Sequence, residues 1–164
     1  MKLPLLKTIL ILSFLTLISC ENKKSKSYQP GVVISFDDAY VDEWFEADKV
    51  LKKYDWKATF CVCRIDSIGK PQMQKLHQLQ DEGHEIAGHG YHHYNAVKFV
   101  AKNGIDEYLK QEIDPMMVSM KKNGFNISSF AYPYGERSAV LDSALAPKFK
   151  IIRGRDFEDK KPEK

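Results

Sequence analysis

Two short groups of polar residues could together bind a catalytic metal ion. Asp37 and Asp38 are adjacent, and His89 and His93 lie four positions apart later in the chain. Each group follows a short apolar run that is typical of a buried strand. One aspartate and two histidines suffice to hold a divalent ion with a position open for water, and the other aspartate could accept a proton from that water. The pattern predicts a metal-dependent hydrolase.

These residue types also have plainer interpretations. The two aspartates could cap a following helix, because Asp is a favoured N-cap residue. A lone histidine is usually a surface or core residue, although three of the five histidines fall within 89–93. His92 could support the ligands or replace one of them. His77 and His84 are expected to be structural, because they lie in or just after a predicted helix.

Strands and helices are predicted to alternate along the chain. Apolar runs indicate five strands, at 31–36, 58–63, 85–88, 127–132 and 149–153. Helical periodicity indicates four helices, at 41–54, 71–82, 104–122 and 138–145. Pro115 should kink or divide the third of these helices. The alternation favours a parallel sheet with helices outside it, and the polar groups follow strand ends, where a β/α barrel keeps its active site.

The chain resembles the polysaccharide deacetylase family, which includes chitin, chitooligosaccharide and peptidoglycan deacetylases and acetylxylan esterases. The resemblance spans about 31–155, and its motifs occur in the family's order at 33–38, 57–60, 83–93 and 130–135. It implies a deformed TIM-like (β/α) barrel of seven to eight strands, with only about the first five β/α units present. It also implies hydrolysis of acetyl groups from a cell-envelope or extracellular polysaccharide. N-acetyl groups are the first expectation and O-acetyl groups the second.

The resemblance also assigns roles to the polar residues. Asp38, His89 and His93 would hold one divalent ion, and Asp37 would be the catalytic base. Zinc is the expected ion, with cobalt, manganese or nickel as alternatives. The backbone N–H of Tyr134 would stabilise the oxyanion.

The motif at 130–135 is also expected to contact the substrate, through Tyr132, Pro133 and Tyr134. Its proline and glycine would equally suit a simple turn. Two other interpretations of the whole chain stay open. One is a non-catalytic glycan-binding or scaffold lipoprotein derived from a deacetylase, and the other is a hydrolase of a different amide or ester.

The chain departs from the family pattern at several positions. Ala39 stands where the family usually has Gly, and Gly90 replaces the Ser or Thr that steadies the metal-binding loop. Ala131 replaces the arginine that orients the base, so Asp37 must be held in another way or left looser. No histidine follows His93, so the later Leu-x-His motif with the general acid has no counterpart. We therefore expect the catalytic domain to be C-terminally incomplete, and this fragment could be inactive alone.

The N-terminal residues predict export and lipidation. Lys2 and Lys7 flank an apolar stretch that leads to Ser19 and Cys20, which resembles a bacterial lipobox. An ordinary signal with a chance cysteine is the alternative. The predicted organisation is a signal peptide at 1–19, a tether at 20–30 lipidated at Cys20, and a partial catalytic domain at 31–164.

The predicted location is the bacterial cell envelope, with the lipid as the only membrane attachment. The formal net charge of +3, part of which leaves with the signal peptide, requires neither an acidic partner nor nucleic acid. Cys61 and Cys63 are expected to be packed thiols without a bridge, since they lie two residues apart on one predicted strand.

Overall fold

Within residues 31–155, five short parallel strands form one sheet in the order β1-β2-β3-β4-β5. The computed structural model describes residues 31–155, so the predicted signal peptide, Cys20 and the tether lie outside the described residues. The unit that carries the predicted site begins at Val33. Its strands are β1 (Ser35–Asp38), β2 (Thr59–Val62), β3 (Glu85–Gly88), β4 (Ser129–Ala131) and β5 (Ile151–Arg153).

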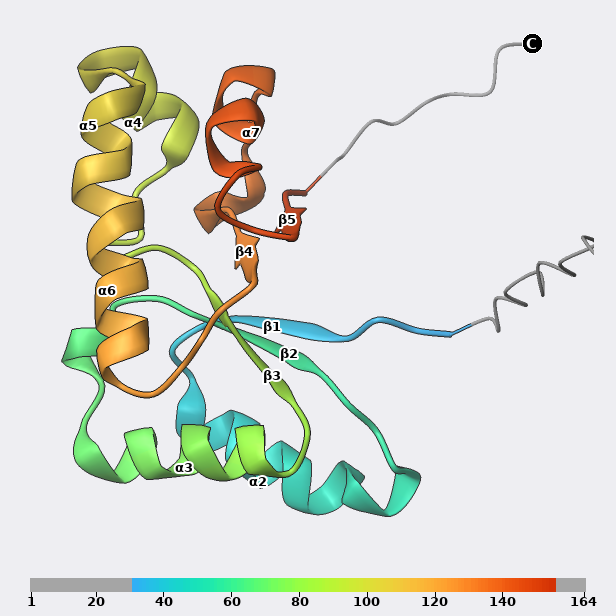
Figure 1. Cartoon of the computed structure of the whole chain (residues 1–164). Helices are drawn as coiled ribbons and strands as arrows, with labels where there is room; N and C mark the ends of the chain where they lie inside the picture. Colours follow the sequence, from blue (N-terminus) through green and yellow to red (C-terminus); the bar gives the residue numbers. More distant parts are fainter. Residues whose placement is uncertain (1–30, 156–164) are drawn as a thin grey trace, which may run out of the picture. The chain divides into compact units, whose positions relative to one another are not determined.

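Helical segments separate consecutive strands, as the sequence predicts. The helices are α2 (Val41–Leu51), α3 (Lys70–Asp81), α4 (Ala96–Asn103), α5 (Ile105–Tyr108), α6 (Asp114–Lys122) and α7 (Ala139–Leu145). Short helical turns occur at η1 (Lys52–Tyr54), η2 (Ile65–Ser67), η3 (Leu109–Ile113, a π-helical turn) and η4 (Pro133–Gly135). Figure 1 shows α2 and α3 side by side, and both α3 and α6 contact β3. This arrangement is that of the first five units of a (β/α) barrel, which confirms the predicted fold class.

The first strand differs from its prediction. It begins at Ser35 and not at 31, and it includes both Asp37 and Asp38. Its neighbour in the sheet is β2, with Asp37 paired to Cys61. The apolar residues before it are not buried, since Val33 is 93% exposed. Apolar composition alone therefore misplaced this edge strand by several residues.

The predicted helix at 104–122 is divided in the structure. Pro115 lies in the first turn of α6, and the chain adopts the π-helical turn η3 directly before that helix. Proline has no N–H to continue an α-helical hydrogen-bond ladder, which explains why the helix changes form here. Helix α4 was not predicted. It begins after Asn95, whose side chain accepts a hydrogen bond from the Lys98 N–H at 3.0 Å.

The core lies between the sheet and the helices. Trp44 of α2 stacks on Phe60 of β2, with ring centroids 5.1 Å apart. Three small residues of neighbouring strands, Cys61, Ala87 and Ala131, form a separate buried cluster. Both Cys61 and Cys63 are free, which confirms the prediction of unbridged thiols. In the part of the chain that the structure describes, we find no helix with the length and hydropathy required to cross a membrane.

Candidate metal centre

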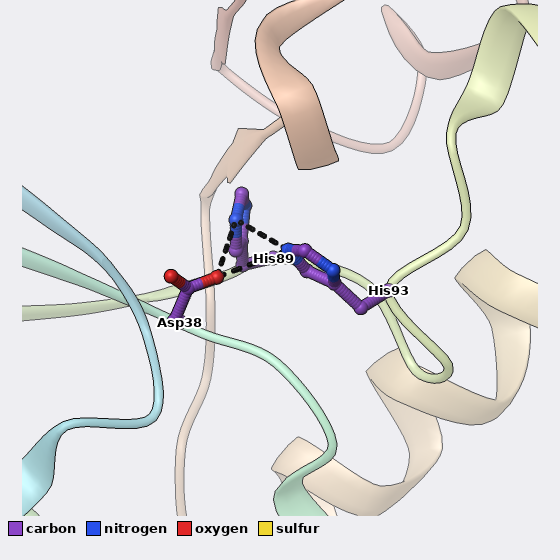
Figure 2. A group of neighbouring side chains, drawn as sticks. All are labelled: Asp38, His89 and His93. Atoms are coloured by element: carbon purple, nitrogen blue, oxygen red, sulfur yellow. Dashed lines mark hydrogen bonds and ion pairs between the residues drawn. The ribbon is translucent and has the colours of Figure 1, made fainter.

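The side chains of Asp38, His89 and His93 point toward one another (Figure 2). Asp38 ends β1, whereas His89 directly follows β3 and His93 lies in the next loop. His93 Nε2 is 3.0 Å from Asp38 Oδ1, and His89 Nε2 is 3.6 Å from the same oxygen. The two Nε2 atoms are 3.3 Å apart. The parallel sheet thus brings together residues that are distant in sequence, because its strands end at a common edge.

These distances match the edges of a metal coordination polyhedron. Zinc lies about 2.0–2.2 Å from nitrogen and oxygen ligands, so two ligands of one ion are about 3.0 Å apart at a right angle and about 3.4 Å apart at a tetrahedral angle. The three measured separations span 3.0 to 3.6 Å. The cluster therefore fits one divalent ion without rearrangement of its backbone.

The hydrogen bonds of His89 leave its Nε2 available as a ligand. His89 Nδ1 lies 2.9 Å from the carbonyl oxygen of Ala131. A carbonyl can only accept, so Nδ1 carries the proton and donates, and the lone pair is on Nε2. Burial lowers the pKa of His93, and the neighbouring His89 lowers it further. Both effects favour the neutral imidazole that metal binding requires.

A second group, Asp48, Glu82 and His84, has similar composition but the opposite tautomer. The Ala58 N–H donates to His84 Nδ1 at 3.1 Å, so the proton of this ring is on Nε2. That Nε2–H donates to Asp48 Oδ1 at 3.0 Å. Neither nitrogen of His84 has a lone pair available for an ion. Asp48 and His84 form a buried hydrogen-bonded pair, which agrees with the structural role predicted for His84.

The backbone is strained at two of the three candidate ligands. Asp38 has a φ of 88° and His93 a φ of 68°, both in the left-handed region that non-glycine residues seldom adopt. Such conformations cost about 1–3 kcal/mol each and persist where the surrounding structure demands them. The strain is concentrated where the side chains must converge.

Asp37 is held by Arg153, a residue that the sequence analysis did not identify. Arg153 Nη2 donates a short hydrogen bond to Asp37 Oδ1 and also lies 3.9 Å from Cys61 Sγ. Arg153 ends β5 and is paired in register with Ala131 of β4. Arg153 thus offers Asp37 a guanidinium from the position on β5 that neighbours Ala131, where the family usually has an arginine. The only sequence signal for it was its place at the end of a predicted strand.

The motif at 130–135 divides into buried and exposed parts. Tyr134 is 57% exposed and its ring centroid lies 4.9 Å from that of His93. Tyr132 is 1% exposed, and its hydroxyl donates to Asp142 at 3.1 Å. Pro133 is also buried. The Tyr132 and Pro133 side chains are thus turned into the core while Tyr134 is exposed, and the predicted contact of these three residues with substrate stays a prediction.

The structure also decides the plainer roles of the neighbouring polar residues. Neither Asp37 nor Asp38 is the cap of α2, because its N-cap is Tyr40 and no side chain caps it. His92 is exposed and stacks on Tyr94 at 5.0 Å, outside the ligand group. His77 stacks on Phe125 at 4.5 Å, which agrees with a structural role.

Two of the three candidate ligands open onto a cavity of about 370 Å³. Asp38 and His93 line it together with Tyr40, Cys63 and Arg64. Burial raises the pKa of the Cys63 thiol to about 11, so this cysteine is a neutral wall residue at physiological pH. A ligand could therefore approach the metal site from solvent through this opening.

Comparisons with known proteins identify the family of the chain. The family model for polysaccharide deacetylase matches residues 24–147. YxkH of Bacillus subtilis (strain 168), whose name assigns it provisionally to the polysaccharide deacetylases, is 44% identical over 65 residues, which are 40% of this chain and 22% of that protein.

Solved structures share the fold. The deacetylase PplD of Streptococcus pyogenes aligns with a TM-score of 0.61 at 21% identity, over 76% of this chain and 55% of its own. The peptidoglycan deacetylase PdaC of Bacillus subtilis aligns with a TM-score of 0.58 at 25% identity, over 75% of this chain and 57% of its own. The chain thus spans little more than half of these structures. The family match covers most of the chain, and the chain belongs to the polysaccharide deacetylase family.

Proposed function

We propose that this chain is the metal-binding part of a deacetylase that hydrolyses N-acetyl groups of a polysaccharide and releases acetate. The observation that carries the proposal is the cluster of Asp38, His89 and His93, with separations suited to one ion and a lone pair on His89 Nε2. A divalent ion bound there would lower the pKa of water and polarise the acetyl carbonyl. Zinc is the first candidate, because the ligands are two imidazoles and one carboxylate.

The residues around the ion would divide the chemistry between them. Asp38 would be committed to the ion, so Asp37 would be the carboxylate left to take a proton from the attacking water. Arg153 holds Asp37 through its hydrogen bond to Oδ1. The backbone N–H of Tyr134 would donate to the carbonyl oxygen as it becomes negative. Its left-handed backbone, with a φ of 63°, turns this residue at the end of β4 beside His93.

The relatives favour a polymer of the cell envelope as the substrate. PdaC is described as a peptidoglycan deacetylase, and the PplD structure contains acetate. We propose N-acetylglucosamine units of such a polymer as the substrate class. We further propose lipidation at Cys20 and location in the bacterial envelope. Mass spectrometry of the membrane-extracted protein should show Cys20 as a lipid-modified N-terminus, and an unmodified Cys20 in a soluble product would contradict this.

The enzymatic proposal is tested by acetate release from N-acetylglucosamine oligomers by the native protein. A chelator should abolish release, and zinc, cobalt, manganese or nickel should restore it to different extents. Asp37→Asn should keep metal affinity and lower turnover by about 10²- to 10⁴-fold, the scale for a lost general base. His93→Ala should lose metal affinity itself.

His77→Ala provides a control, because His77 stacks on Phe125 outside the metal cluster. It should change neither metal affinity nor turnover. Acetate release that is insensitive to chelation, or full activity in Asp37→Asn, would refute the proposal. Metal-dependent glycan binding without acetate release would favour the glycan-binding interpretation instead.

A further inference from the structure

The loop that carries His93 is held by a buried carboxylate from another part of the chain. Glu112 is completely buried, with 0% exposure. Its Oε2 accepts a hydrogen bond from the His92 N–H at 2.8 Å, and its Oε1 accepts one from the Tyr94 N–H at 2.9 Å. The two bonded N–H groups thus belong to the residues on either side of His93. The carboxylate therefore holds the loop on both sides of the candidate ligand His93.

The loop is shaped to receive this carboxylate. Gly90 and His93 both have left-handed backbones, with φ values of 91° and 68°. His93 lies between the two residues whose N–H groups bind the carboxylate, so its left-handed conformation shapes this part of the loop. A Cβ atom at position 90 would overlap Glu112 Oε1, so a larger residue there would have to displace the carboxylate, and the left-handed φ disfavours it further. The Gly90 departure from the family pattern and the burial of Glu112 are therefore parts of one arrangement.

The helix that carries Glu112 is also irregular at this point. Glu112 lies in the π-helical turn η3, just before Pro115 and α6. A π-turn widens the helix locally and is often found at functional sites. Met116, one turn further along, places its Sδ 3.1 Å from the Gly90 nitrogen. Through Glu112 and Met116, this irregular segment contacts the loop that carries His93 at several backbone N–H groups.

A purely structural carboxylate is a weaker explanation of these contacts. A buried charge is costly unless it is hydrogen-bonded, and an apolar side chain would fill the same volume without that cost. Glu112 instead accepts hydrogen bonds from the His92 and Tyr94 backbone N–H groups. Complete burial also prevents Glu112 from touching a substrate.

We propose that Glu112 is the positioning residue of the metal site, which fixes the loop so that His93 Nε2 faces Asp38 and His89. It takes over the steadying role that a Ser or Thr at position 90 would otherwise have. This inference rests on the proposed function only in requiring that the site binds an ion. It does not depend on which acetylated substrate is used.

The decisive variant is Glu112→Gln in the full chain. Glutamine keeps the shape but has a single acceptor oxygen, so one of the two N–H groups loses its partner. We expect zinc affinity, measured by competition with a chromophoric chelator, to fall about 10- to 100-fold, the usual effect of losing a group that orients a ligand. The absorption spectrum of the cobalt-loaded protein should also change, because it reports ligand geometry. Hydrogen exchange of the His92 and Tyr94 amides should accelerate in the metal-free protein.

Glu85→Gln is the matched control. Glu85 also accepts two side-chain hydrogen bonds, from Thr59 at 2.8 Å and Ser129 at 2.5 Å, but it lies within β3 and outside the ligand cluster. It should lower thermal stability without changing zinc affinity or the cobalt spectrum. If Glu112→Gln lowers only the melting temperature, or lowers affinity no more than Glu85→Gln, the proposal is wrong. Should the wild-type protein bind zinc without releasing acetate, the proposed function fails, but this comparison still decides the role of Glu112.

Discussion

Removal of the Arg153 guanidinium should reduce catalysis without emptying the metal site. Arg153 donates to Asp37, the proposed base, and makes no contact with the three candidate ligands among the interactions described. In Arg153→Ala the Asp37 carboxylate loses the group that fixes its orientation. It should then spend less time directed at the attacking water, while Asp38, His89 and His93 stay in place.

The size of the effect follows from the exposure of the pair. A hydrogen bond to a charged group contributes about 1.5–3 kcal/mol when it is buried. The Arg153 and Asp37 side chains are 39% and 37% exposed, so solvent screening must reduce this contribution. A surface ion pair contributes less than about 1 kcal/mol. We therefore take an intermediate contribution of about 1–2 kcal/mol for the Arg153–Asp37 pair. At about 1.36 kcal/mol per tenfold change in rate, kcat should fall about 5- to 30-fold.

The assay is acetate release by the native protein, with kcat, KM and zinc affinity measured on each variant. Arg153→Lys should recover part of kcat, because it keeps the charge but not the planar fork of donors. The double variant Arg153→Ala with Ala131→Arg should recover more, since residues 131 and 153 are register neighbours. Arg137→Ala, which removes a pair with Asp142 at 2.6 Å, is the control. Unchanged kcat in Arg153→Ala, or an equal loss of zinc affinity, would refute this reasoning.

Three further predictions concern the loop and the cavity. Gly90→Ala should displace the Glu112 carboxylate and lower zinc affinity, and it should add little in the Glu112→Gln background; additive effects would show that the two residues act separately. Burial lowers the pKa of His93 in the folded protein, so folding favours the neutral imidazole. The melting temperature of the metal-free protein should therefore decrease as the pH falls below about 6.5, the pKa of an unfolded histidine. A melting temperature that rises in that range would contradict the sign. The Cys63 thiol, with its pKa raised to about 11, should react with iodoacetamide far more slowly in the folded than in the unfolded protein at pH 8, and comparable rates would argue against its burial.

The sequence was informative wherever local patterns determine structure. Apolar runs and helical periodicity located all five strands and most helices, because each element is specified by the spacing of its own side chains. The strand at 85–88 has the predicted bounds. The same patterns put Asp38, His89 and His93 at strand ends, and parallel strands end at a common edge. The convergence of the three side chains was therefore predictable from topology.

Local patterns predicted the bounds of elements less reliably where strand pairing or a helix start decides them. The run at 31–36 is apolar, yet pairing starts only at Ser35 of an edge strand. Helix α4 was missed, although Asn95 at its start is a favoured N-cap residue. The burial of Tyr132, whose hydroxyl donates to Asp142, was also not evident from its motif. Each of these features depends on pairing or packing with neighbours that a local pattern does not contain.

The supporting groups of the site were decided only by the tertiary structure. Arg153 reaches Asp37 across 116 positions of the chain, from β5 to β1, and Glu112 reaches the His93 loop from a π-helical turn. Neither residue belongs to a local pattern, because its partner is set by how the sheet curves and how the helix packs. The two histidine groups make the same point: His84 and His89 are chemically identical. His84 Nδ1 accepts a hydrogen bond from a backbone N–H, whereas His89 Nδ1 donates one to a backbone carbonyl. This difference decides that His89, and not His84, keeps the Nε2 lone pair for a metal.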